Sequence, residues 1–281
     1  MINKTLAIFE SELSDLKQKQ APLEWASPRN NLGYALVSLG REKSDSDALK
    51  RTITELEAAL EDCNPVDTLE EWITLQTKLA AALHALGQRD TGETVSILNK
   101  AMEGYKRILP AIKRQEAPLE WALLLHNIAA VFQDLGEYSE GPRTLERSVS
   151  AYSNALTQRT YDAVPLEWAV TQNNAAVSMQ IIGEIKQDAD ILKESVLFYG
   201  NACQELSQEK QPLAWVIATG NLGCAQTILA EKTKDVEIAQ QAVDNFTDIM
   251  SFFDNTTNAQ YLELTEQYRD KAQTVLKKIG G

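Results

Sequence analysis

The amino-acid sequence predicts an all-α fold, an α-solenoid built from antiparallel helix pairs. The main observation is a repeat, because 47, 49, 47 and 47 residues separate the successive tryptophans Trp25, Trp72, Trp121, Trp168 and Trp215. An apolar residue recurs seven positions after each one, at Leu32, Leu79, Ile128, Ala175 and Leu222. A glycine recurs fifteen positions after the first four, at Gly40, Gly87, Gly136 and Gly183, with Ala230 in the last repeat. Self-similarity at a period of roughly 20–50 residues is typical of a solenoid, whose repeats bury their apolar faces against one another.

Each repeat is predicted to contain two helices. The first carries a single apolar stripe within about 60° of arc, formed in the first repeat by Trp25, Leu32, Leu36 and Leu39. Pro22 suits the first turn of this helix, and Gly40 is expected to end it in the left-handed conformation. The second helix has apolar residues at three- and four-residue spacing, as in Ile53, Leu56 and Leu60.

The repeats divide the whole chain into one solenoid domain of about twelve helices. A half-repeat covers residues 1–20, and full repeats cover 21–67, 68–116, 117–163, 164–210 and 211–257. Residues 258–281 are expected to form a capping helix. Pro110 predicts a break in the helix of the second repeat, and Gly141-Pro142 predicts a turn followed by a helix start.

Composition narrows the classes of partner and the cellular compartment. The net charge of −13 disfavours nucleic acid and anionic membranes as partners, because both carry negative charge. The N-terminus lacks the apolar core of a signal peptide, and the longest apolar run is far too short to span a membrane. The three cysteines show no metal-binding or disulfide spacing and are expected as buried, reduced thiols. We therefore expect a cytoplasmic protein.

The sequence predicts no catalytic residue, no bound metal and no cofactor. Phosphate-binding glycine loops and nucleophile-elbow motifs are absent from it. His84 and His126 have no metal-ligand partner at motif spacing and are expected as surface or lightly packed side chains. The tryptophans are expected in the core where repeats meet, rather than as an aromatic box around a ligand.

The residues Asn31, Leu32, Gly33, Leu36, Leu39 and Gly40 match the first-helix pattern of a tetratricopeptide repeat, and the sequence resembles that family over nearly its whole length. It departs in length, since the usual repeat has about 34 residues and these repeats are about thirteen longer. The chain therefore resembles a long variant with a PLxWAxTQNNLG-type phrase. The resemblance implies a right-handed superhelix whose first helices line a concave groove that binds peptides or proteins.

Candidate partner-binding residues come from the inward positions of the first helices. Six positions after the tryptophans stand Asn31, Lys78, Asn127, Asn174 and Asn221. In the resembled family the matching asparagine hydrogen-bonds the backbone of a bound peptide. The alternative is that these amides tie neighbouring helices together. Further candidates on the face opposite the apolar stripe are Asn30, Tyr34, His126, Asn173 and Val177.

The predicted groove becomes apolar towards the C-terminus, which favours a hydrophobic partner segment. Alternatively, these small apolar residues pack the first helices of adjacent repeats together, and self-association through the strip is left open. The predicted function is a non-enzymatic scaffold that binds a protein or peptide. The alternative is a regulatory sensor whose superhelix closes on a small peptide or metabolite.

Overall fold

The structure, a computed structural model, describes residues 46–61, 63, 65–89, 92–253 and 259–281. In this part of the chain the regular structure is ten α-helices with two short helical turns, and consecutive helices pack as pairs. The predicted all-α, solenoid-like fold is thereby confirmed. The described residues divide into two compact units. We call them the α3–α7 unit, which ends at Ala163, and the α8–α12 unit, which begins at Val164.

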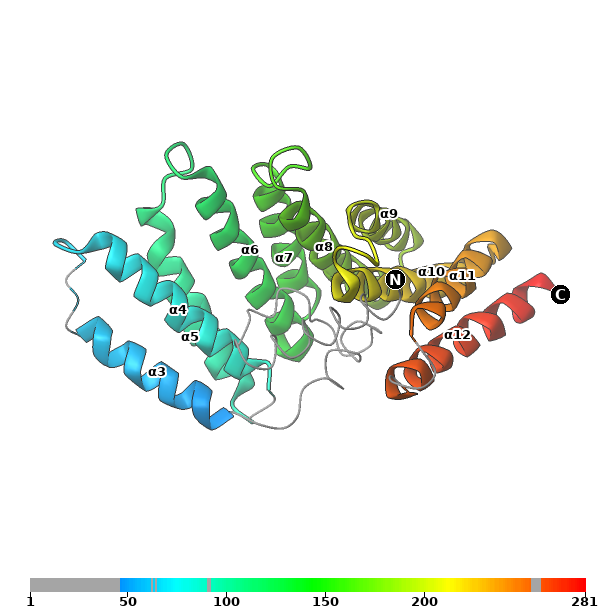
Figure 1. The fold of residues 1–281 in the computed structure, drawn as a ribbon, viewed down its shortest axis with the longest axis horizontal. Helices are drawn as coiled ribbons and strands as arrows, with labels where there is room; N and C mark the ends of the chain where they lie inside the picture. Colours follow the sequence, from blue (N-terminus) through cyan, green and yellow to red (C-terminus); the bar gives the residue numbers. More distant parts are fainter. Residues whose placement is uncertain (1–45, 62, 64, 90–91, 254–258) are drawn as a thin grey trace. The chain divides into compact units, whose positions relative to one another are not determined.

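The α3–α7 unit alternates second and first helices of the predicted repeats (Figure 1). Its elements are α3 (Ser46–Glu61), α4 (Leu69–Gly87), α5 (Thr94–Ile108), the 3-10 turn η1 (Leu109–Ala111), α6 (Pro118–Leu135), the π-turn η2 (Gly136–Glu140) and α7 (Pro142–Leu156). Helix α5 ends at Ile108 and is followed by the 3-10 turn that contains Pro110. The predicted break at Pro110 is confirmed, as is the helix start at Pro142 after Gly141.

The α8–α12 unit contains the last two full repeats and the C-terminal helix. Its elements are α8 (Pro165–Lys186), α9 (Ala189–Glu205), α10 (Pro212–Thr233), α11 (Val236–Phe252) and α12 (Ala259–Gly280). Helix α12 packs against both α10 and α11. The predicted C-terminal helix is therefore present and covers the last repeat.

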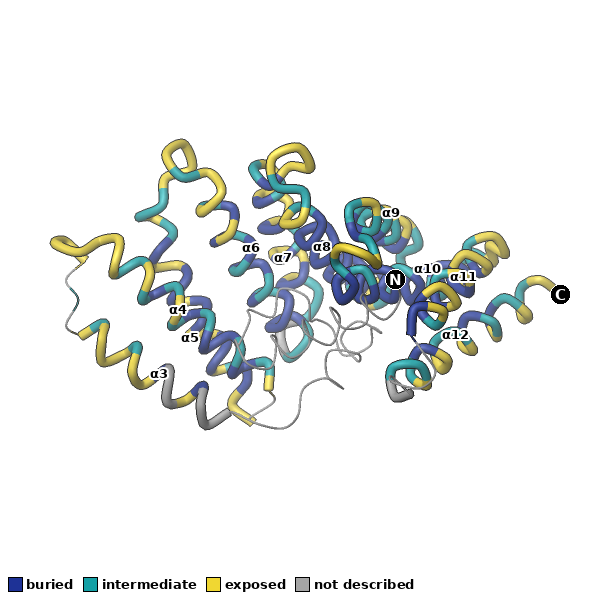
Figure 2. The backbone as a smooth tube through the Cα atoms, in the orientation of Figure 1, coloured by how far each residue is buried: buried dark blue, intermediate teal, exposed yellow. Residues whose placement is uncertain are grey.

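The first helices are the most deeply buried elements of the α8–α12 unit (Figure 2). Ten consecutive residues of α8, from Thr171 to Gln180, are all buried. Helix α10 is likewise buried along most of its length, with apolar residues such as Val216 and Ile217 fully enclosed. A helix that is buried all round has no polar stripe, unlike the one-sided second helices that lie against solvent.

The first helices start as the sequence predicts. Pro118, Pro165 and Pro212 each occupy the first turn of their helix, where the missing N–H is not needed. Helix α4, which lacks this proline, begins at Leu69 with two glutamates in its first turn. Negative charge there is favourable at the positive end of the helix.

The left-handed conformation predicted for Gly40 does not occur at the equivalent glycines that the structure describes. Gly40 lies outside the described residues, but the equivalent Gly87, Gly136 and Gly183 all have helical backbones. A Cβ atom added at any of them would come within 2.7–2.8 Å of the nearest side-chain atom of a leucine in the following helix. These leucines are Leu98, Leu145 and Leu192. The glycine is required for close helix packing.

The repeat that lacks this glycine also lacks the leucine. Ala230 stands where the others have glycine, and Ala239 stands where they have leucine. Both alanines are buried, at 0% and 1% exposure, and they share one apolar cluster. The two changes compensate each other, because a methyl group on α10 faces a methyl group on α11 instead of a leucine.

Left-handed residues do end two of the first helices, four positions beyond the glycine site. Gln187 follows α8 with φ 54°, and Lys234 follows α10 with φ 61°. The next residue in each case is an aspartate, Asp188 or Asp235, whose carboxylate accepts hydrogen bonds from backbone N–H groups at the start of the second helix. This capping satisfies donors that the helix itself leaves unpaired.

The second helices α5, α7, α9 and α11 each also contribute one large, fully buried ring to the core. The rings are Tyr105, Tyr152, Tyr199 and Phe246. Two of the tyrosines donate their hydroxyl group to a glutamine of their own first helix, Tyr152 to Gln133 at 3.4 Å and Tyr199 to Gln180 at 3.1 Å. These bonds satisfy a buried polar group and fix the two helices of a repeat against each other.

The four described tryptophans are only partly buried, so the expectation of core tryptophans holds in part. Trp215 packs edge-on against Phe252 with ring centroids 5.7 Å apart. Trp121 lies under the guanidinium group of Arg114, whose central carbon is 4.9 Å from the ring centroid. The expectation of buried thiols also holds in part: Cys224 is buried, whereas Cys63 and Cys203 are partly exposed, and all three are free.

Candidate functional site

The predicted partner-binding residues fall into three groups. Asn30, Asn31 and Tyr34 lie outside the described residues. Lys78, His126 and Asn127 belong to the first helices of the α3–α7 unit, and the remaining candidates belong to those of the α8–α12 unit: Asn173, Asn174, Val177 and Asn221. The two units bury their candidates to different degrees.

In the α3–α7 unit two of these candidates, Lys78 and Asn127, reach solvent. Lys78 on α4 is exposed, and Asn127 on α6 is partly exposed. Neither side chain makes a hydrogen bond or ion pair within the described chain. On α4, the position that corresponds to Asn173 of α8 is occupied by Thr77. The Thr77 hydroxyl group donates to the carbonyl oxygen of Ile73 at 2.7 Å and makes no bond to Asn127. The amide of Asn127 therefore retains its donor and acceptor groups.

His126 does not line a groove, and the expectation of a lightly packed or surface imidazole is wrong for both histidines. His126 is 0% exposed, and His84 is 8% exposed. The His126 ring lies edge-on to the Tyr152 ring, with centroids 5.2 Å apart. Burial, with a smaller contribution from the positive charge of Arg159, lowers the pKa of His126 well below its usual value of 6.5. His126 is therefore a neutral core side chain at physiological pH.

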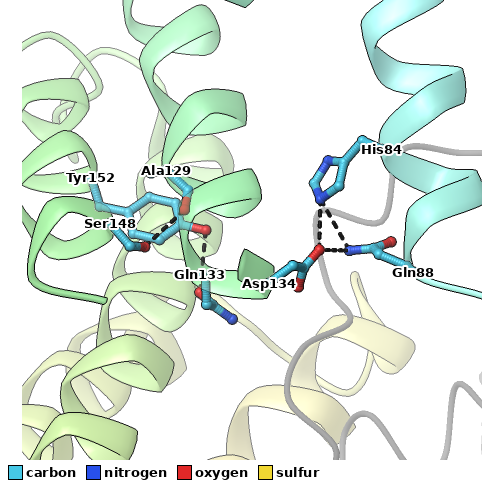
Figure 3. Close-up of polar contacts among 7 residues, drawn as sticks. All are labelled: His84, Gln88, Ala129, Gln133, Asp134, Ser148 and Tyr152. Carbon is cyan, nitrogen blue, oxygen red and sulfur yellow. Dashed lines mark hydrogen bonds and ion pairs between the residues drawn. The ribbon is translucent and has the colours of Figure 1, made fainter. Parts of the chain in front are cut away.

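A polar cluster that the sequence analysis did not identify joins α4 to α6 (Figure 3). The His84 Nε2 atom lies 2.7 Å from Asp134 Oδ2, and the Gln88 amide donates to the same oxygen at 2.7 Å. Asp134 is 5% exposed, so this is a buried carboxylate held by two neighbours. Because the two first helices belong to consecutive repeats, the cluster links one repeat to the next by directional bonds.

The repeat alignment contains the signal that would have identified this cluster. Twelve positions after the tryptophan, two repeats have Gln133 and Gln180, which accept from tyrosines, whereas the second repeat has His84. A titratable ring at a position that elsewhere holds a buried amide indicates a different bonding partner. Its partner, Asp134, is 50 residues away in the chain, so only the tertiary structure brings them together.

In the α8–α12 unit the candidate asparagines form a chain of buried amides. Asn221 on α10 donates through Nδ2 to Asn173 Oδ1 on α8 at 3.1 Å. Asn173 in turn donates to Asn174 Oδ1 at 3.0 Å. Their exposed fractions are 1%, 0% and 6% respectively. These three amides tie the first helices together, so the expectation that they face an open groove is wrong for this unit.

The predicted apolar strip is also buried. Val177 on α8 is 0% exposed and shares an apolar cluster with Ala225 on α10 and Tyr199 on α9. Ile217 and Cys224 on α10, at equivalent inward positions, are buried as well. Here the alternative interpretation fits the structure, since small apolar residues pack adjacent first helices together.

The chemistry available to these side chains is mainly hydrogen bonding. Burial raises the pKa of the Cys203 thiol to about 11, so the reactive thiolate is scarce at neutral pH. No group of three His, Cys, Asp or Glu side chains with the geometry to hold a metal ion occurs in the described ranges.

Helix α10 is the one described helix long and apolar enough to cross a membrane. However, 78% of its most apolar window is buried within the structure, as expected of a core helix.

Comparisons with known proteins give no family. No family model matches the chain, and no curated protein matches it. One solved structure, described as "Computational Design of Self-Assembling Cyclic Protein Homooligomers", is 14% identical over 89% of this chain and 97% of its own. Its TM-score is 0.23, which is too low to support any conclusion about this chain.

Proposed function

We propose that the chain is a non-enzymatic repeat protein, similar to tetratricopeptide-repeat proteins, that binds a protein or peptide through first helices of the α3–α7 unit. The observation that carries the proposal is the difference between repeat-equivalent asparagines. Asn221 on α10 is buried and bonded to α8, whereas Asn127 on α6 is partly exposed and makes no hydrogen bond with another described residue.

An unused amide at this position suits a peptide ligand. The amide donates and accepts at once, so it can pair with both polar groups of a peptide backbone without selecting a side chain. Lys78, exposed at the equivalent position on α4, adds a positive charge that suits an acidic or carboxylate-bearing partner. The buried bond between His84 and Asp134 holds α4 and α6 together and keeps their inward faces in a defined arrangement.

The proposal can be tested with peptides selected from a random library against the purified chain. Asn127→Ala, alone and combined with Lys78→Ala, is expected to weaken binding of the selected peptides by about 2- to 13-fold per lost contact, because one hydrogen bond contributes about 0.5–1.5 kcal/mol. The matched control is Asn201→Ala, a partly exposed asparagine on the second helix α9, which should leave affinity unchanged. Thermal unfolding of each variant confirms that the fold is intact. Peptides that bind the double variant as tightly as the original chain would refute the proposal.

A further inference from the structure

A cavity of about 380 Å³ lies in the α3–α7 unit, between the second helices α3 and α5 and above the first helix α4. Its volume falls within the range of roughly 300–1,000 Å³ that is typical of small-molecule sites. Where α4 and α5 meet beneath it, a Cβ atom added at Gly104 would lie 3.0 Å from the Ala80 side chain. The two helices are therefore in close contact at Gly104, which lines the cavity.

One buried polar side chain in this cavity has no hydrogen-bond partner. Gln76 on α4 lines the cavity, is 7% exposed, and makes no hydrogen bond with any other residue in the described part of the chain. The Gln76 amide atoms themselves remain accessible, so its donor and acceptor groups open into the cavity. An amide complements another amide, because each offers one donor and one acceptor to the other. Gln76 therefore indicates a ligand that contains a peptide group.

The wall beside Gln76 is apolar. Leu79 and Leu83 follow it on the same face of α4, one turn apart, and both line the cavity. Leu83 is 8% exposed and Leu79 is partly buried, so both present carbon surface to the cavity rather than to bulk water. This surface suits one aliphatic or aromatic side chain of the ligand.

The rim carries charges of both signs. Lys100 and Arg107 line it from α5, and Glu57 lines it from α3. None of the three makes an ion pair with another described residue. The remaining acid of the rim, Glu103, is already paired with Lys106 at 3.3 Å. A cation on one side and a carboxylate on the other complement a ligand with an anionic and a cationic end.

From these contacts we infer that this cavity binds a short peptide with free termini and an apolar side chain, such as a dipeptide or tripeptide. The ligand carboxylate binds Lys100 or Arg107, its ammonium group binds Glu57, its peptide group binds Gln76, and its side chain packs on Leu79 and Leu83.

This site is separate from the face proposed above to bind a partner. Gln76 and Lys78 are two residues apart on α4, and two residues turn a helix by about 200°, so their side chains leave the helix on nearly opposite faces. The substitution Asn127→Ala should therefore leave short-peptide binding unchanged, and failure of either proposal would not decide the other.

The test is isothermal titration of the full chain with the tripeptide Gly-Leu-Gly, and with forms of it that are N-acetylated, C-amidated or both. Saturable binding is expected for the free peptide at up to millimolar concentration, and each blocked terminus should weaken it by about 10-fold. Arg107→Met and Lys100→Met remove the rim cations, and at least one of them should weaken the free peptide by a similar factor. Lys210→Met removes an exposed lysine that does not line the cavity and makes no ion pair with another described residue, so it is the control and should change nothing.

Gln76→Leu should weaken every form of the peptide equally, because it removes the contact with the peptide group. The methionine variants change exposed side chains and should keep the fold, so they still test the inference if Gln76→Leu does not fold. The inference is overturned if the free peptide does not bind, if the doubly blocked peptide binds equally well, or if the Lys210 variant weakens binding as much as the rim variants do.

Discussion

Replacing Gly183 by alanine should destabilise the protein or stabilise it, depending on the residue across the helix interface. The added Cβ atom would lie 2.8 Å from Leu192 Cγ and 3.0 Å from Leu192 Cδ2, closer than packed carbons tolerate. Overpacking of this kind costs about 1–3 kcal/mol, and the gain in helix propensity from glycine to alanine returns about 1 kcal/mol. We expect Gly183→Ala to lower the free energy of unfolding by about 1 kcal/mol.

In a Leu192→Ala background the same change should become stabilising. Leu192→Ala alone should cost about 2–5 kcal/mol, because it leaves a cavity in a fully packed interface. The side-chain atoms that the new methyl group would strike are then gone, and alanine at position 183 gains about 1 kcal/mol from helix propensity. The chain already contains this combination at Ala230 and Ala239, which are both buried. The expected coupling between the two substitutions is about 2 kcal/mol.

The assay is a double-mutant cycle, with unfolding by urea followed by circular dichroism and hydrogen exchange of the α8 and α9 amides. Gly200→Ala is the control, because it makes the same substitution inside α9 at a position where nothing lies within 4 Å of the added Cβ. It should stabilise the protein by about 1 kcal/mol in both backgrounds. Additive effects of Gly183→Ala and Leu192→Ala would refute the assignment of the glycine to close packing.

Three further predictions follow from buried polar groups. Burial keeps His126 neutral in the folded state, whereas the unfolded state takes up a proton below pH 6.5. The free energy of unfolding should therefore fall on acidification below that pH, by up to about 1.4 kcal/mol per pH unit. Urea unfolding at pH 5 and pH 7 measures this, and His126→Gln should remove that part of the slope. The pKa of the Cys203 thiol is about 11 in the native protein, against an ordinary value of 9.0, so much less thiolate is present at pH 8. Alkylation of Cys203 at pH 8 should therefore be about 100-fold slower in the native protein than in urea, and mass spectrometry can follow it. Asn173→Ala should lower the free energy of unfolding by about 1–3 kcal/mol, because it leaves the Asn221 amide buried without its acceptor; an unchanged urea midpoint would contradict this.

Local sequence was sufficient to predict the helices. The tryptophan spacing, the three- and four-residue apolar periodicity and the prolines at 118, 165 and 212 act within one or two helical turns, and the structure has helices where they predict them. The break after α5 follows directly from the chemistry of Pro110. Such signals are readable because a turn of helix depends mainly on residues within four positions of one another.

The role of the glycines could not be read in this way. A glycine near the end of a helix is consistent with a left-handed cap and also with close packing against another helix. Gly183 has the second role because Leu192 lies across the interface, and the left-handed residue is Gln187 instead. Only the distance between the two helices distinguishes these roles.

The candidate binding residues show the same limit. By itself, the sequence determined an all-α repeat fold, the order of its helices and the amide-rich character of the first helices. The tertiary structure decided which of those amides are already bonded: Asn221 is bonded to Asn173 and buried, whereas Asn127 is partly exposed and makes no hydrogen bond with another described residue. It also brought His84 to Asp134 and placed Gln76 in a cavity. The physical reason is that burial and hydrogen-bond satisfaction depend on residues about 50 positions away, and the periodicity that predicts a helix carries no information about which groups its neighbours leave unpaired.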